Sequence, residues 1–130
     1  MRKILLDANA YVAYLKGDEQ VLEALARAET VFMSVIVLGE LQAGFMGGPR
    51  PGGNLAYLER FLEKSSVKAL DATRETAAVF GDLKEKLKKA GTPLPINDVW
   101  IAAHALETGS LLITYDTHFR QITGLRKWPI

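Results

Sequence analysis

Four acidic residues lie beside or within apolar segments, where an ionised carboxylate is costly to keep. They are Asp7, Glu40, Asp98 and Asp116, whereas most of the remaining acids stand among polar neighbours in segments with helical periodicity. Carboxylates that a fold holds close together repel each other and lose hydration. Such a cluster is therefore expected where bound cations neutralise its charge. Carboxylate oxygens suit Mg²⁺ or Mn²⁺, and these ions can activate water and stabilise the leaving oxygen of a phosphodiester.

Each of the four acids also has an ordinary structural explanation. Asp7 can cap or anchor a turn, and Asp116 can do the same after its own apolar segment. Glu40 can face solvent on a helix, and Asp98 can stabilise a helix N-terminus through the helix dipole. The hypothesis of a shared site therefore rests on where the fold places the four residues together.

Apolar segments of the chain alternate with amphipathic ones and predict an α/β fold. Strands are expected at residues 4–6, 30–37, 66–70, 110–116 and 125–128. Helices are expected at residues 11–15, 17–29, 38–44, 55–64, 80–90 and 96–107, and the Gly/Pro-rich segment 44–54 is expected to form a loop. Such alternation produces right-handed crossovers and a parallel sheet with helices on both faces.

The predicted sheet brings the acids toward one edge. In an open parallel sheet, ligands bind in the crevice at the carboxyl ends of the strands, where the strand order switches. Asp7 directly follows one predicted strand, and Asp116 lies at the carboxyl end of another. Glu40 and Asp98 begin elements that can open onto the same crevice. We therefore predict a shared site for divalent metal.

Composition narrows the classes of protein to consider. The chain has 130 residues, which predicts one domain spanning residues 1–130. A net charge of +1 excludes a strongly basic nucleic-acid module, although a local basic patch can still meet nucleic acid. The absence of cysteine excludes a disulfide scaffold, a thiol nucleophile and a Cys-ligated zinc site. The chain shows neither a cleavable signal segment nor an apolar run of about 20 residues, so we expect a cytoplasmic protein.

Four motifs resemble those of a known family. The strings "LLDANAYV", "VLGEL", "INDVWIAAHAL" and "LLITYDTHF", in that order and spacing, resemble PIN-domain ribonucleases and among them the VapC-like toxins of toxin–antitoxin pairs. The resemblance covers essentially the whole chain. It implies a three-layer α/β/α sandwich with a mainly parallel, five-stranded sheet. It also implies an endoribonuclease that uses Mg²⁺ or Mn²⁺, acts on RNA with tRNA among the candidate substrates, forms a homodimer and is silenced by a cognate antitoxin.

The resemblance also assigns roles to single residues. The catalytic and metal-binding acids of the family map onto the four acids named above, Asp7, Glu40, Asp98 and Asp116. Asn9 and Thr114 match family positions expected to support those acids. Ala8 departs from the pattern, because the family often has Thr or Ser there, and a hydroxyl that orients Asp7 is expected to be missing. The segment 44–53 is idiosyncratic, which leaves its part in substrate recognition open.

Basic residues and apolar surfaces suggest partners. Arg50, His118 and Arg120 are candidate contacts for RNA, and His118 can instead order the turn after Asp116. His104 lies off the helical face of Asp98 and is interpreted as structural. Apolar helix surfaces around residues 35–46 and 55–62 exceed what one core needs, which favours a two-fold dimer.

Other functions remain open from the sequence alone. A receiver-type phosphoacceptor domain could use Asp71 and Lys127, but it would carry paired acids after the first strand, where this chain has Asp7 and Ala8. A phosphatase of the haloacid-dehalogenase type would need a second Asp at the position of Asn9. A catalytically inactive PIN-like module that binds RNA or protein stays an alternative.

Overall fold

The computed structural model describes residues 2–128 and contains a parallel sheet. Its five strands lie in the order β3-β2-β1-β4-β5, and every neighbouring pair is parallel. The strands are β1 (Lys3–Leu6), β2 (Thr30–Ser34), β3 (Val67–Leu70), β4 (Leu111–Ile113) and β5 (Lys127–Trp128). The predicted α/β fold with a five-stranded parallel sheet is confirmed.

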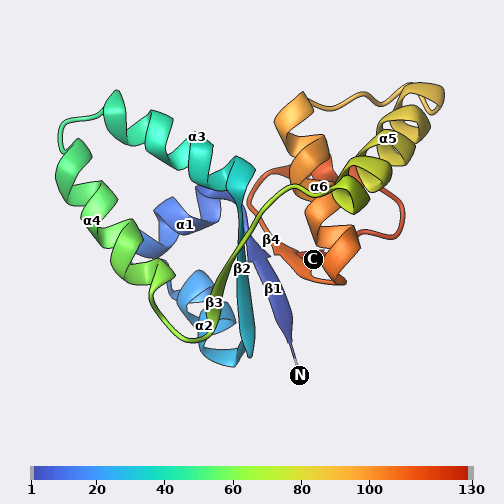
Figure 1. The fold of residues 1–130 in the computed structure, drawn as a ribbon. Helices are drawn as coiled ribbons and strands as arrows, with labels where there is room; N and C mark the ends of the chain where they lie inside the picture. Colours follow the sequence, from blue (N-terminus) through green and yellow to red (C-terminus); the bar gives the residue numbers. More distant parts are fainter. Residues whose placement is uncertain (1, 129–130) are drawn as a thin grey trace.

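Within residues 2–128, six α-helices cover the two faces of this sheet (Figure 1). One face carries α1 (Ala8–Leu15), α2 (Glu19–Arg27), α3 (Val35–Met46) and α4 (Pro51–Leu62). The other face carries α5 (Arg74–Lys89) and α6 (Ile96–Thr108). The chain moves outward from β1 to β3 and then returns to β4, so right-handed crossovers put the two groups of helices on opposite faces. This arrangement confirms the three-layer sandwich.

The core forms where the central strand and α6 meet. Ile4, Leu5 and Leu6 of β1 are all buried, because a parallel strand with helices on both faces has no solvent side. Helix α6 is apolar almost all round since it packs against α5, α3 and the sheet strands β1 and β4. Both elements therefore hold the residues at their ends in fixed positions.

The boundary between β2 and α3 differs from the prediction. Residues 35–37 were expected to continue the strand, but β2 ends at Ser34 and α3 begins at Val35. The Ser34 hydroxyl oxygen accepts a hydrogen bond of 3.1 Å from the backbone N–H of Ile36, which caps the helix. The β-branched run Val35–Val37 favours a strand by propensity, and this cap overrides it. Glu40 consequently lies inside α3 and not at its beginning.

The Gly/Pro-rich segment 44–54 is largely helical, so the expectation of a long loop there was wrong. Helix α3 continues to Met46 and α4 begins at Pro51, which leaves residues 47–50 between the two helices. Proline is well tolerated at the first position of a helix, because the N–H that it lacks has no partner there. The two helices pack on each other as a hairpin. Among residues 2–128, no helix has the length and apolar character that crossing a membrane requires.

Candidate active site

The site lies at the point where the strand order reverses, between β1 and β4. Asp7 follows β1 directly, and its backbone N–H donates to the carbonyl of Ile113 in β4 at 3.0 Å. Asp116 follows β4, Asp98 lies in the first turn of α6, and Glu40 comes from α3. The charges of Asp98 and Asp116 act on Asp7, and those of Asp7 and Asp98 act on Glu40, so the other carboxylates all lie within electrostatic reach of Asp7.

Asp7 is the most buried of these acids, with 5% of the residue exposed. One carboxylate oxygen accepts the backbone N–H of Ala8 at 2.8 Å, so Asp7 does cap α1. The other oxygen accepts the hydroxyl of Thr114 at 2.8 Å. Burial raises the pKa of Asp7, the hydrogen bonds from Thr114 and Ala8 oppose this rise, and the charges of Asp98 and Asp116 add to it. Asp7 therefore caps α1, but its surroundings do not fully neutralise the negative charge of its carboxylate.

Asn9 and Thr114 connect the end of β1 to the turn after β4. The Asn9 amide nitrogen lies 3.4 Å from Asp7 Oδ2 and 3.3 Å from Thr114 Oγ1, and its amide oxygen accepts the backbone N–H of Tyr115 at 3.0 Å. Thr114 Oγ1 also accepts the backbone N–H of Asp116 at 3.0 Å. This geometry fits a supporting role for both residues. It also shows that Asp7 has a hydroxyl partner although position 8 is alanine.

Glu40 is half-buried on α3 and has one polar partner from the opposite helix layer. The amide nitrogen of Asn97 in α6 donates to Glu40 Oε2 at 3.4 Å. Burial raises the pKa of Glu40, the hydrogen bond from Asn97 lowers it, and the charges of Asp7 and Asp98 raise it further. Asn97 was not among the expected site residues, and its only sequence signal is that it precedes Asp98.

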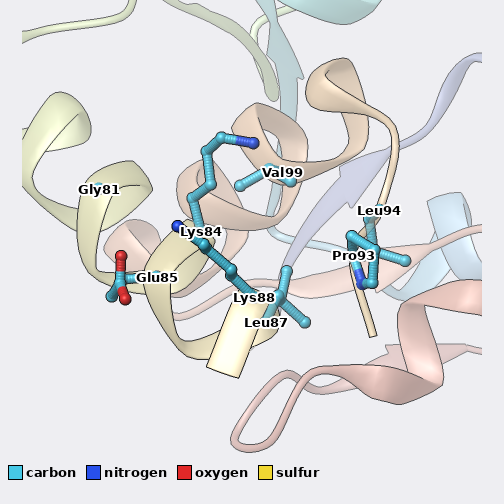
Figure 2. Close-up of a pocket in the computed structure, with 8 residues that line it drawn as sticks. All are labelled: Gly81, Lys84, Glu85, Leu87, Lys88, Pro93, Leu94 and Val99. Atoms are coloured by element: carbon cyan, nitrogen blue, oxygen red, sulfur yellow. The ribbon is translucent and has the colours of Figure 1, made fainter. Parts of the chain in front are cut away.

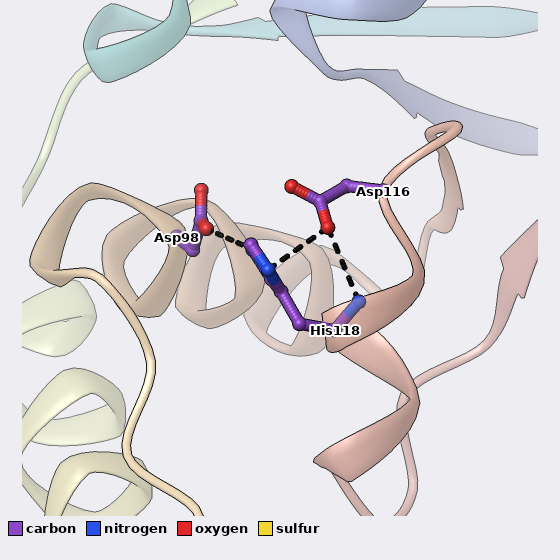
Figure 3. A group of neighbouring side chains, drawn as sticks. All are labelled: Asp98, Asp116 and His118. Carbon is purple, nitrogen blue, oxygen red and sulfur yellow. Dashed lines mark hydrogen bonds and ion pairs between the residues drawn. The ribbon is translucent and has the colours of Figure 1, made fainter.

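His118 joins two of the acids (Figure 3). Its ring nitrogen Nε2 contacts Asp98 Oδ2, while Nδ1 lies 2.9 Å from Asp116 Oδ1. The backbone N–H of His118 donates to the same Asp116 oxygen at 3.1 Å, which caps the short 3₁₀ helix Thr117–Gln121. The turn-ordering interpretation of His118 is therefore present in the structure. The contact with Asp98 was not expected, because the two residues are 20 positions apart in the sequence.

The other candidate basic residues are distributed around the molecule. Arg120 is exposed and shares a small hollow of about 30 Å³ with Thr114 and Asp116. Arg50 lies in the turn between α3 and α4, which Figure 1 shows at the end of this hairpin away from β4. His104 is buried, with Nδ1 2.8 Å from the Ser34 hydroxyl and Nε2 3.2 Å from the Asp71 carbonyl oxygen. These contacts fit the structural role expected of His104.

The chain matches the PIN domain family model over residues 4–125. It belongs to the PIN domain family. It is 34% identical over 131 residues to Ribonuclease VapC2 of Haemophilus influenzae, which covers 97% of this chain and 96% of that protein. It is 30% identical over 129 residues to the tRNA(fMet)-specific endonuclease VapC of Salmonella typhimurium, with 97% and 96% covered.

Solved structures agree with this assignment of the PIN domain. DNA-bound VapBC from Salmonella typhimurium matches with a TM-score of 0.85 at 30% identity, covering 98% of this chain and 97% of that chain. VapBC2 from Rickettsia felis, bound to a DNA fragment from its promoter, matches with a TM-score of 0.83 at 30% identity, covering 96% of each chain. Because the chain belongs to the PIN domain family, the receiver-type and haloacid-dehalogenase interpretations no longer apply.

A second cleft of this PIN domain lies beside α5 (Figure 2). It has a volume of about 310 Å³ and lies between α5 and the segment that leads into α6. Lys84 and Lys88 contribute cationic side chains, and Leu94 and Val99 contribute apolar ones. None of the four acids lines it, but Val99 follows Asp98 directly in α6. The cleft is therefore separate from the four acids.

The donor atoms of the PIN-domain site fit a divalent cation. Ligand atoms of Asp98, Asp116 and His118 lie within 4.8 Å of one another, so this group could hold a metal ion. Asp7 and Glu40, whose pKa values are raised, add carboxylates to the same region. A cation would remove the repulsion that contributes to both shifts.

We expect Asp7→Asn to stabilise the metal-free protein. Asparagine retains an oxygen that can cap α1, and it removes a charge that the site disfavours. The pKa of Asp7 in the folded protein lies above its ordinary value of 3.8, so folding favours the protonated form of Asp7. The stability that this gives is fully present below pH 3.8 and is lost as pH rises through the pKa of the folded protein. The variant escapes this loss. Urea unfolding in EDTA should show a gain on the order of 1 kcal/mol near neutral pH and a smaller gain near pH 4.

The control for this experiment is Asp82→Asn, which neutralises a mostly exposed acid on α5 and should show no such dependence on pH. Asp98→Asn also removes a repelling charge, but it takes away a carboxylate partner of His118, so the gain is expected at Asp7 alone. An Asp7→Asn variant that is less stable than wild type near neutral pH would contradict the account.

Proposed function

We propose that this chain is a metal-dependent endoribonuclease of the VapC type, which hydrolyses phosphodiester bonds in RNA as the toxin of a toxin–antitoxin pair. The observation that carries the proposal is the group of mutually repelling carboxylates at the strand-order switch of a PIN domain. Relatives of near-equal length carry the name ribonuclease VapC, and solved structures with the same fold are VapBC complexes. A cognate antitoxin is therefore the proposed protein partner, and the cytoplasm is the proposed location.

The four acids would hold Mg²⁺ or Mn²⁺ through their carboxylate oxygens. When bound, such an ion supplies an activated water and stabilises the negative charge on the leaving oxygen. The chain's own residues prepare the site. Thr114 and the backbone of Ala8 fix both oxygens of Asp7, and Asn97 holds Glu40, so little reorganisation is needed when the substrate arrives.

Cationic side chains near the acids are suited to the phosphates of an RNA backbone. Arg120 shares a hollow with Asp116, and Lys84 and Lys88 line the cleft beside α5, to which Val99, the residue after Asp98, also contributes. Contacts of this kind position RNA without reading its sequence. We propose tRNA as a substrate to be tested first, because one relative is named as tRNA(fMet)-specific. An RNA contact of Arg50 stays a prediction.

Cleavage should depend on divalent metal and on the four acids. Purified chain without antitoxin is expected to cut total tRNA or structured RNA in Mg²⁺ or Mn²⁺ and to be inactive in EDTA. Asp7→Asn, Glu40→Gln and Asp98→Asn should each reduce the rate about 100-fold or more, since each removes a carboxylate of the metal set. Asp116→Asn should be milder, because Asp116 Oδ1 lies against the backbone N–H and ring Nδ1 of His118, and an amide oxygen can still accept both. The rates are measured on end-labelled RNA separated on denaturing gels.

Asp82→Asn is the matched control, because it changes an exposed acid to its amide outside the site and should cut like wild type. Equal cutting in EDTA would contradict the metal mechanism. Binding of RNA without any cutting in either metal would favour the inactive PIN-like module.

We also propose that two copies associate through α3 and α4. Met46 and Tyr57 are 77% and 56% exposed, and Leu55 lines a small hollow with Met46, so these helices present apolar surface that a second copy can bury. Light scattering at micromolar concentration should give twice the 14.3 kDa of one chain. Met46→Lys combined with Tyr57→Lys should shift the protein toward the monomer mass. A monomer mass for wild type would contradict the proposal.

A further inference from the structure

His118 lies between two carboxylates that the family pattern assigns to metal. Both of its ring nitrogens contact carboxylate oxygens, Nε2 with Asp98 Oδ2 and Nδ1 with Asp116 Oδ1 at 2.9 Å. An ionised carboxylate oxygen can only accept a hydrogen bond, and a neutral imidazole has a single N–H. A neutral ring therefore places a lone pair against a carboxylate oxygen in one of the two contacts, whereas a ring that carries a second proton donates in both.

The local turn indicates which contact that is. Asp116 Oδ1 is fixed by the backbone N–H of His118, and Nδ1 lies next to the same oxygen. A proton on Nδ1 thus points at Asp116, and Nε2 then faces Asp98 with its lone pair. Two acceptors in direct contact repel each other, so a second proton or a metal ion must lie at Nε2.

His104 shows that this problem is particular to His118. Its ring contacts a hydroxyl, that of Ser34, and a carbonyl oxygen, that of Asp71. The hydroxyl can donate to one ring nitrogen while the other donates to the carbonyl, so the neutral ring has both nitrogens satisfied. His104 is satisfied as a neutral ring, whereas His118 needs a second proton or a bound cation at Nε2.

We propose that His118 is a direct ligand of the metal ion through Nε2, and that it makes the site prefer a first-row transition ion to Mg²⁺. This inference rests on the proposed function, since it concerns the same metal site. A metal-binding histidine commonly donates its other N–H to a carboxylate, and Asp116 is placed to accept it. The ligand atoms of Asp98, Asp116 and His118 are mutually within 4.8 Å. Imidazole nitrogen suits transition ions, whereas Mg²⁺ is bound almost entirely through oxygen.

Mn²⁺ is the probe, because it is paramagnetic and accepts both oxygen and nitrogen ligands. Purified full-length chain, stripped of metal with EDTA and dialysed, is loaded with Mn²⁺ and examined by pulsed electron paramagnetic resonance. The bound ion should show coupling to an imidazole nitrogen nucleus, and His118→Gln should lose this coupling although His104 is still present. By calorimetric titration, His118→Gln should weaken Mn²⁺ binding about tenfold or more and Mg²⁺ binding less than about threefold.

The spectrum of wild type alone decides the proposal, so it remains testable if the variant folds poorly. Bound Mn²⁺ without nitrogen coupling, or equal weakening of both metals in the variant, would overturn the role of His118 and leave the carboxylate site and the proposed function standing. If wild type binds neither Mn²⁺ nor Mg²⁺, both this inference and the metal-dependent function are wrong.

Discussion

The buried charge of Asp7 is the constraint on which the site depends. Its carboxylate lies at the end of the central strand, almost without solvent, and within reach of the charges of Asp98 and Asp116. The N-terminus of α1, the Ala8 amide and the Thr114 hydroxyl supply partial positive charge. The pKa of Asp7 remains raised, which indicates that these groups do not fully offset the effect of burial. The folded site therefore favours a species that carries full positive charge.

The topology of the sheet explains why the charge is found there. The crossover that leaves β1 runs over one face of the sheet, and the crossover that leads into β4 runs over the other, so their helices lie on opposite faces. The crevice between them receives Asp7 from β1 and Asp116 from beyond β4. Asn9, Thr114 and His118 then hydrogen-bond across it, so the strand ends and the acids are held as one unit.

Much of this arrangement could be predicted from the sequence, and the failures have identifiable causes. Apolar runs predicted the strands, and the position of Asp7 and Asp116 just after two of them indicated the edge of the sheet that carries the acids. The β-branched residues Val35–Val37 were wrongly predicted as strand, because the Ser34 cap of α3 outweighs their strand propensity. The glycines and prolines at 44–54 led to the wrong prediction of a loop, because Pro51 occupies the first position of α4.

The pairings of Glu40 with Asn97 and of Asp98 with His118 could not be predicted, since they join distant segments and depend on how α6 packs.

Thermal unfolding with and without metal tests the central claim most directly. If the carboxylates form one cation site in the folded chain, Mn²⁺ or Mg²⁺ at about 100 times its dissociation constant should stabilise wild type by about 2.7 kcal/mol, with no RNA present. Glu40→Gln, with one carboxylate fewer, should gain less from the same metal. An unchanged melting temperature for wild type across the titration would contradict the claim that these acids bind metal together.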